Sequence, residues 1–254
     1  MQAFVVADVH GFYDEMIEAL SKVGYDKENP NHCFVSLGDL MDRGPKPKEC
    51  LEFVNSLPAK NKILIRGNHE DLIVQAIRRK YFGLHDVHNK TMQTAFDLTD
   101  TSTDDYKSGI VDDGDILRKL ENYEPLNTYL DSCMDYFENN NVIFVHGWIP
   151  CFERSDGGFI FDEDWRNDNW DGARWICGFD AWHSGVVVPD KTIWCGHWHT
   201  SYAHYKYHKE GVEWYEGGEP AIFTPFEDVG IIGMDGCTAY SGIVNCKKIG
   251  KFKR

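Results

Sequence analysis

The 254-residue sequence is short of basic residues, long apolar runs and paired cysteines, and each shortage excludes a class of protein. It has 26 Lys and Arg against 41 Asp and Glu, a net charge of −15, which argues against nonspecific binding to nucleic-acid polymers. No apolar stretch approaches the roughly 20 residues that cross a bilayer. No basic segment precedes the apolar residues 3–7, so neither a membrane span nor a signal peptide is expected.

The eight cysteines are scattered, and none forms a C-x-x-C pair. Cys33, Cys195 and Cys246 lie in or beside apolar runs, as small buried side chains do. An even cysteine count is weak evidence for disulfides in a chain of this length. We therefore expect free thiols and a reducing, cytoplasmic location.

Apolar runs and helical patterns alternate over the first 80 residues. The expected strands are 4–6, 33–37 and 63–65, and the expected helices are 14–22, 47–56 and 70–80. Pro47 suits the first turn of the second helix. This alternation predicts a largely parallel sheet with right-handed crossovers.

The pattern changes after residue 80. Residues 81–140 are polar and acidic with weak helical periodicity, which predicts either a mostly helical insertion beside a functional site or a solvated helical cover. Further strands are expected at 142–145 and 192–194, followed by antiparallel strands at 221–223, 229–233 and 242–246. We expect one domain over 1–254, an α/β protein with two packed sheets flanked by helices.

Five short polar motifs each follow an apolar run. They are Asp8-Val9-His10, Gly38-Asp39-Leu40-Met41-Asp42-Arg43-Gly44, Gly67-Asn68-His69-Glu70, Val145-His146-Gly147 and Gly196-His197-Trp198-His199. A ligand residue at the end of a strand lies at the carboxyl edge of its sheet, and five converging edges would hold two metal ions. The pattern predicts a phosphoester hydrolase.

The residue types in these motifs suit divalent cations, which take carboxylate oxygen and neutral imidazole nitrogen. Asp8 and His10 are two apart, so both can reach one ion from an extended segment. The carboxylate of Asp39 can bridge two ions, and Asn68 offers an amide oxygen. Bound cations also weaken the objection that an acidic protein would repel a phosphate substrate.

In order and spacing, these motifs resemble the calcineurin-like metallophosphoesterases. The G-D-x-x-D-R-G and G-N-H-E forms are most similar to the phosphoprotein phosphatase branch, which includes serine/threonine protein phosphatases and symmetrical diadenosine tetraphosphatases. The resemblance runs from Met1 to about Ile249 and is poorest over 81–140. It implies a four-layer α/β/β/α sandwich of two mixed sheets flanked by helices.

The resemblance also implies a dinuclear centre holding manganese, with iron or zinc as alternatives. The first metal would be held by Asp8, His10 and Asp39, the second by Asp39, Asn68, His146 and His197, and His199 would be a further ligand of the first. His69 resembles the general acid that protonates the leaving oxygen, Asp42 its orienting carboxylate, and Arg43 a phosphate clamp. A second clamp is expected among Arg154, Arg166 and Arg174, and the Ala173-Arg174-Trp175 context favours Arg174.

The expected reaction is direct attack by a metal-bridging hydroxide on a phosphomonoester, without a phosphoenzyme. The main prediction is a serine/threonine protein phosphatase, with a phosphorylated protein or a small phosphoester as its partner. One alternative is a dinucleoside polyphosphate hydrolase acting on diadenosine tetraphosphate. Another is a noncatalytic interaction module, which would be expected to have lost ligands that are all present here.

Two further groups of residues have weaker signals. His183, His204 and His208 lie near Trp or Tyr and are interpreted as lacking metal-ligand spacing. Trp165, Trp170, Trp175 and Trp182 are expected in the core or a cleft wall, although aromatic residues lining a groove could bind a nucleoside or a peptide.

Overall fold

The N-terminal third alternates strands and helices as predicted in the computed structural model, which describes residues 1–215 and 220–254. The elements are β1 (Gln2–Val6), α1 (Tyr13–Lys22), β2 (His32–Ser36), α2 (Pro47–Ser56), the short η1 (Ala59–Asn61), β3 (Lys62–Ile65) and α3 (Asn68–Arg79). The three strands are parallel neighbours. Every residue of β2 and β3 is buried, which explains the apolar runs at 33–35 and 63–65.

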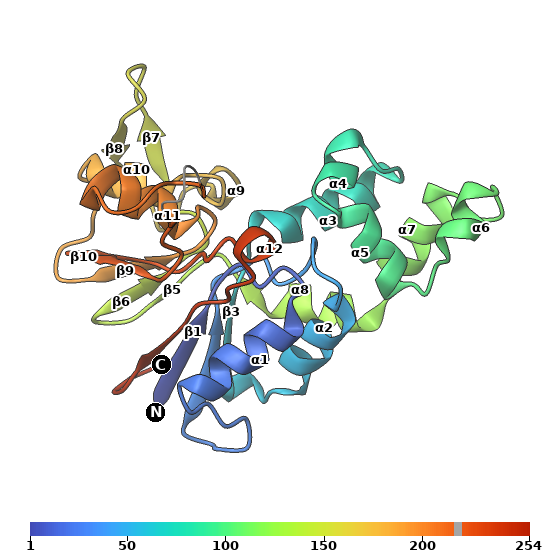
Figure 1. Cartoon of the computed structure of the whole chain (residues 1–254), viewed down its shortest axis with the longest axis horizontal. Coiled ribbons are helices and arrows are strands. Elements are labelled where there is room, and N and C mark those ends of the chain that lie inside the picture. Colours follow the sequence, from blue (N-terminus) through green and yellow to red (C-terminus); the bar gives the residue numbers. More distant parts are fainter. Residues whose placement is uncertain (216–219) are drawn as a thin grey trace.

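Five helices follow within the segment for which helices were predicted: α4 (Leu84–His88), α5 (Thr91–Leu98), α6 (Thr103–Lys107), α7 (Asp113–Glu121) and α8 (Glu124–Ser132). The side chain of Asp112 accepts a hydrogen bond from the backbone N–H of Asp115, which fixes the start of α7. The apolar faces of α5, α7 and α8 join the core formed by α1, α2 and α3. In Figure 1, α4 to α7 extend to one side of this layer.

The strands form two five-stranded sheets and a small hairpin. The first sheet has the order β12-β1-β2-β3-β4, with β4 at Cys133–Met134 and β12 at Cys246–Ile249. The second has the order β10-β11-β9-β6-β5, with β5 (Phe137–Glu138), β6 (Val142–Phe144), β9 (Thr192–Cys195), β10 (Phe226–Asp228) and β11 (Ile231–Gly233). β7 (Cys151–Glu153) and β8 (Phe159–Phe161) form the hairpin.

The prediction of antiparallel strands near the C-terminus is correct in part, because β10 pairs antiparallel with β11 and β12 with β1. β11 runs parallel to β9, and only its pairing with β10 is antiparallel. Ala221 forms a single bridge with Val212 outside the named strands, and the last strand is β12 rather than 242–246. The apolar pattern located buried segments but not their directions, because a strand buries the same residues in either direction.

Three apolar clusters define the layers. One lies between the two sheets and includes Val5, Val35, Phe144 and Trp194. A second packs the first sheet against the helices described above, and a third packs the second sheet against α9 (Trp170–Ala173), α10 (Gly178–His183) and α11 (Thr200–Ala203). The predicted four-layer α/β/β/α sandwich of two mixed sheets is confirmed (Figure 1).

Among the described residues, no helix combines the length and the apolar character needed to span a bilayer.

The remaining elements are η2 (His204–His208), a π-helix that continues from α11, and α12 (Thr238–Ser241). The five polar motifs follow β1, β2, β3, β6 and β9. Within each sheet these strands are parallel neighbours, so their carboxyl ends share one edge.

Candidate dinuclear metal centre

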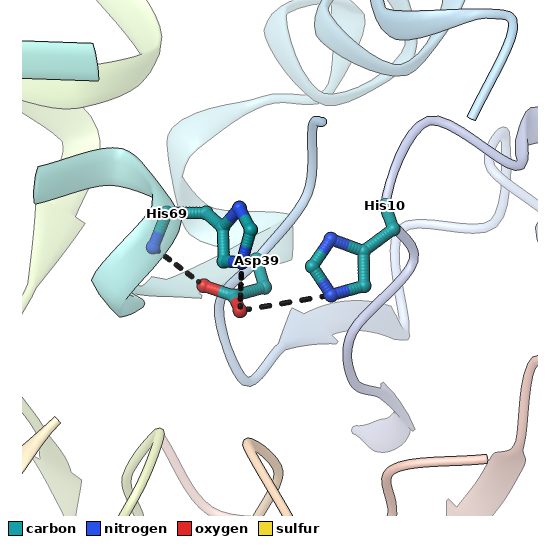
Figure 2. A group of neighbouring side chains, drawn as sticks. All are labelled: His10, Asp39 and His69. Carbon is teal, nitrogen blue, oxygen red and sulfur yellow. Dashed lines mark hydrogen bonds and ion pairs between the residues drawn. The ribbon is translucent and has the colours of Figure 1, made fainter. Parts of the chain in front are cut away.

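Asp39 lies at the middle of the polar cluster and is almost completely buried. Its Oδ2 lies 3.7 Å from Nε2 of His10 and 3.8 Å from Nε2 of His69, and its Oδ1 lies 3.4 Å from Nε2 of His146. Figure 2 shows His10 and His69 on two sides of this carboxylate, with the backbone N–H of His69 donating to Oδ1. One carboxylate is thus shared by imidazoles from three different strand ends.

Asn68 and His197 complete a second group around the same carboxylate. One ligand atom each from Asp39, His146 and His197 lies within 4.8 Å of the others. The amide Oδ1 of Asn68 lies 2.8 Å from Nε2 of His146 and 2.9 Å from Nδ1 of His197. Both oxygens of Asp8 accept the backbone N–H of His197, at 3.1 and 3.0 Å.

Two glycines permit this close packing. A Cβ at Gly67 would lie 2.1 Å from Oδ1 of Asp39, and one at Gly196 would lie 2.1 Å from Oδ2 of Asp8. Any side chain at either position would displace a carboxylate. The glycines beside the motifs are therefore required by contact with the ligand residues as well as by turning of the chain.

The backbone of the site is strained. Six of the predicted site residues have left-handed φ angles between 49° and 70°: Asp8, His10, Asp39, Asp42, Arg43 and His197. Such angles are uncommon outside glycine and persist only where the surrounding structure holds them. Each of these turns begins at the end of a strand, and the left-handed angles direct its side chains into the polar cluster.

The pKa values of neighbouring groups are driven apart. Burial alone would raise the pKa of Asp39, but His146 and His69 outweigh it and hold the pKa well below its usual range. Burial would lower the pKa of His146, but Asp39 raises it to about 10. Burial, reinforced by His146, lowers the pKa of His197 to about 3. A cation ligated by His146 would compete with the proton there, because a metal ligand must be a neutral imidazole.

The residues present fit divalent cations. The separations of 3.4–3.8 Å between the Asp39 oxygens and the imidazole nitrogens exceed the usual 2.7–3.2 Å of an N–H···O hydrogen bond. At His10, Nδ1 lies 3.0 Å from the Met41 carbonyl oxygen and donates to it, so Nε2 presents a lone pair on the side of Asp39. The carboxylate, imidazole and amide donors are those that manganese, iron and zinc accept.

The predicted acid and its supports lie beside this centre. Nδ1 of His69 lies 2.7 Å from Oδ2 of Asp42, and its Nε2 lies 3.1 Å from the Arg43 guanidinium. The hydroxyl of Thr91, at the start of α5, donates to the same Oδ2 at 2.6 Å. Burial lowers the pKa of His69, but Asp39 and Asp42 outweigh it, so the net pKa is raised.

Two predicted residues, His199 and Arg174, contact other side chains. His199 contacts the Ser201 hydroxyl at 2.9 Å and the Trp214 ring at 4.3 Å, and in the part of the chain that the structure describes it joins neither group around Asp39. Its role as a metal ligand stays a prediction. Its neighbour in the motif, His197, does reach the centre.

The guanidinium of Arg174 is buried and bound by Asp71 at 2.7 Å, by Asp171 at 2.9 Å and by Asp135. Three carboxylates leave it little capacity to bind a phosphate, so the geometry favours a structural role over the predicted second clamp. The other candidates also pair with carboxylates, Arg154 with Asp156 and Arg166 with Glu138.

Two buried acids were missed. The carboxylate of Glu70 accepts the backbone N–H groups of Asp39, Leu40 and Gly67 and thereby fixes two of the motif loops. Its place in the G-N-H-E motif could have signalled this. Asp235 follows β11 and, after burial itself, is the strongest influence that raises the pKa of Asp8. The strand-end pattern that located the five motifs also applies to it.

Comparison with known proteins agrees with this geometry. Residues 1–217 match the model of the calcineurin-like phosphoesterase family. The chain is 33% identical over 210 residues to PrpE of Bacillus subtilis, an asymmetrical bis(5'-nucleosyl)-tetraphosphatase, covering 74% of this chain and 80% of that protein. It is 42% identical over 85 residues to the symmetrical bis(5'-nucleosyl)-tetraphosphatase of Psychromonas ingrahamii, a match that spans 34% of this chain and only 28% of that protein.

A solved structure described as a candidate diadenosine tetraphosphatase has the same fold, with a TM-score of 0.53, 15% identity, and coverage of 98% of this chain and 89% of that one. The family match spans most of the chain, including all five motifs. The resemblance drawn from the motifs is confirmed: the chain belongs to the calcineurin-like phosphoesterase family and is a phosphoester hydrolase.

Proposed function

We propose that this metallophosphoesterase hydrolyses the polyphosphate bridge of dinucleoside polyphosphates such as diadenosine tetraphosphate. The similarity to the Bacillus subtilis tetraphosphatase, which extends over 80% of that protein, carries the proposal. The main prediction from the sequence, a serine/threonine protein phosphatase, has no comparable support. Its stated alternative becomes the proposed function.

An exposed group of aromatic side chains supports a substrate with bases. This aromatic band consists of Trp175, Trp198, Trp214, Tyr215 and Tyr240, each 37–56% exposed. The rings of Trp175 and Trp198 lie 5.9 and 6.0 Å from the ring of His197, so the band begins at the metal centre. Exposed aromatic faces bind nucleobases by stacking.

His199 packs against this band. Its ring lies 4.3 Å from that of Trp214, which in turn packs against Tyr240 at 5.2 Å. Tyr240 also stacks on Tyr215 at 5.8 Å. We propose that the second histidine of the G-H-x-H motif positions Trp214 for a base.

The residues of the centre would have separate roles in hydrolysis. Divalent ions held by the carboxylates and imidazoles would supply Lewis-acid activation of phosphate and water. A phosphate beside Asp39 would draw the Arg43 guanidinium away from Nε2 of His69, because Arg binds phosphate oxygens with two parallel N–H groups. His69, oriented by Asp42, would then protonate the departing phosphate oxygen.

A direct comparison of substrates tests the proposal. The protein with added manganese is supplied in parallel with diadenosine tetraphosphate and with a phosphoserine peptide, and products are separated by chromatography. We expect a higher kcat/KM for the dinucleotide; AMP and ATP would indicate asymmetrical cleavage, and two ADP symmetrical cleavage. A higher kcat/KM for the peptide would overturn the proposal and favour the protein phosphatase.

Variants test the aromatic band separately. Trp175→Ala and Trp214→Ala should each lower kcat/KM for the dinucleotide about 5- to 150-fold, from about 1–3 kcal/mol per stacked base, and should leave hydrolysis of p-nitrophenyl phosphate nearly unchanged. Phe152→Ala, at an exposed aromatic residue of the β7–β8 hairpin, is the matched control. Equal losses with both substrates would contradict base stacking.

A further inference from the structure

A second cluster of metal-ligand residues lies outside the centre described above. His204 and His208 occupy η2, and Glu210 follows it. One ligand atom from each of the three lies within 4.8 Å of the others. The histidines were interpreted from the sequence as lacking metal-ligand spacing, but two histidines four apart on a helix face the same side.

The His204 ring is oriented so that one nitrogen is bound to the backbone and the other faces the cluster. Its Nε2 lies 3.2 Å from the carbonyl oxygen of Thr224, an acceptor, so this nitrogen carries the proton and Nδ1 presents a lone pair. The residue is 92% buried, and Nδ1 has no hydrogen-bond partner among the described residues. Nδ1 lies 3.7 Å from Oε2 of Glu210, so it faces the cluster. A histidine fixed through its other nitrogen by a backbone carbonyl is the usual arrangement at metal sites.

The backbone brings Glu210 back to His204. The N–H groups of Lys209 and Glu210 both donate to the carbonyl oxygen of His204, which closes a turn wider than that of an α-helix. Lys209 has a left-handed φ of 60°, which ends the helix and redirects the chain. Single turns of π-helix are rare and are found frequently at functional sites.

Asp228, in β10, supplies a second carboxylate. Its Oδ2 lies 3.3 Å from Nε2 of His208, while the rings of His204 and His208 are 5.7 Å apart. A carboxylate bound to one imidazole nitrogen raises the basicity of the other nitrogen and orients it toward a metal. The cluster therefore contains a candidate support for His208 as well as for His204.

We propose that His204, His208 and Glu210 form a mononuclear site for a divalent transition metal of the zinc class, with Asp228 as the supporting carboxylate. Two imidazoles and one carboxylate are a common zinc donor set, and water or a second carboxylate oxygen completes four-coordination. A hydrogen-bonded surface cluster alone would not account for the buried, unpaired Nδ1 of His204. A metal here would fix the end of η2 to β10, directly before residues 211–215, which carry Trp214.

Zinc content tests the site. Three proteins are compared: wild type, His208→Gln and His183→Gln. Each is dialysed against EDTA and then against a small molar excess of zinc chloride, and bound zinc is measured by mass spectrometry. We expect wild type and His183→Gln, an exposed histidine of α10, to bind one ion more per chain than His208→Gln. Equal contents in all three proteins would overturn the proposal. Because the difference is measured, the result does not depend on how many ions the catalytic centre holds.

A second set of variants protects the test against misfolding. Glu210→Gln, at an exposed position, should lose the same ion, and Asp228→Asn should weaken its binding about 10- to 100-fold. In EDTA the variants should unfold at the same temperature as wild type, and zinc should raise the wild-type Tm more than that of His208→Gln or Glu210→Gln. An identical zinc-induced rise in all proteins would contradict the site.

Discussion

The carboxylate of Glu70 offers the sharpest test of how the fold holds its metal-binding loops. It is completely buried and accepts four hydrogen bonds: from the N–H groups of Asp39, Leu40 and Gly67 at 3.0, 3.0 and 2.8 Å, and from the Tyr129 hydroxyl at 3.0 Å. Burial raises the pKa of Tyr129 well above its usual value, so its hydroxyl remains a donor. Glu70→Gln keeps the shape and replaces one acceptor oxygen by a donor.

The cost follows from this geometry. An amide nitrogen at the Oε2 position would face two backbone N–H groups, those of Asp39 and Gly67. At the Oε1 position it would face that of Leu40 and the Tyr129 hydroxyl, which can rotate to accept. The second arrangement leaves the buried N–H of Leu40 unpaired, which costs about 1–3 kcal/mol. It also turns the charge-assisted hydrogen bonds from Asp39 and Gly67 into neutral ones of about half the strength. We expect a loss of about 3 kcal/mol.

Urea unfolding of metal-free protein at pH 7 measures this loss, and manganese titration measures the affinity of the centre. Glu121→Gln is the control, because its half-exposed pair with Lys80 should contribute no more than about 1 kcal/mol. Glu70→Gln should also bind manganese more weakly, since the loop carrying Asp39 loses its anchor. A loss of stability below about 0.5 kcal/mol, with unchanged manganese affinity, would refute the reasoning.

Three further changes test other parts of the structure. Asp39→Asn should reduce manganese content measured by mass spectrometry and bring hydrolysis to background, because this carboxylate belongs to both ligand groups. His69→Asn should retain the metals and slow cleavage about 10²- to 10⁴-fold for poor leaving groups, but less for good ones, when rates are compared across esters of graded leaving-group pKa; equal losses would argue against an acid. Glu138→Gln should cost about 1 kcal/mol at pH 7, after allowance for solvent screening. Arg166, with Lys191, holds the folded pKa of Glu138 at about 2, below its usual 4.5. The stabilisation is therefore complete above pH 4.5 and is lost as pH falls toward 2, which urea unfolding at pH 7 and at pH 3.5 would reveal as a shrinking difference.

Much of the fold was predictable because the relevant signals are local. Helix 47–56 was predicted with its observed bounds, since Pro47 starts it and its apolar positions recur at helical spacing. Strand direction was not predictable in the same way. The direction of β11 is set by its pairing with β9, and the sequence of β11 alone does not indicate this partner.

The contrast between local signals and distant partners also applies to the site residues, because some positions depend on one strand and others on remote segments. Asp8, Asp39 and His146 each follow a strand, and their positions depend on that strand alone once the sheets form. Arg174 and His199 have partners from distant segments, Asp71 and Asp135 for the first and Trp214 for the second. Their surroundings could be known only from the folded chain.

Asp235 shows how the physical pattern extends beyond the family motifs. It follows β11 as Asp8 follows β1 in the other sheet, and burial raises its pKa to about 6. Together with Asp39 and Glu70, these acids bury four carboxyl groups at one end of the two sheets. Buried carboxylates are costly unless they are paired, and the neighbouring imidazoles and backbone N–H groups pair them only in part. Divalent cations at this edge would complete the pairing and offset the local negative charge.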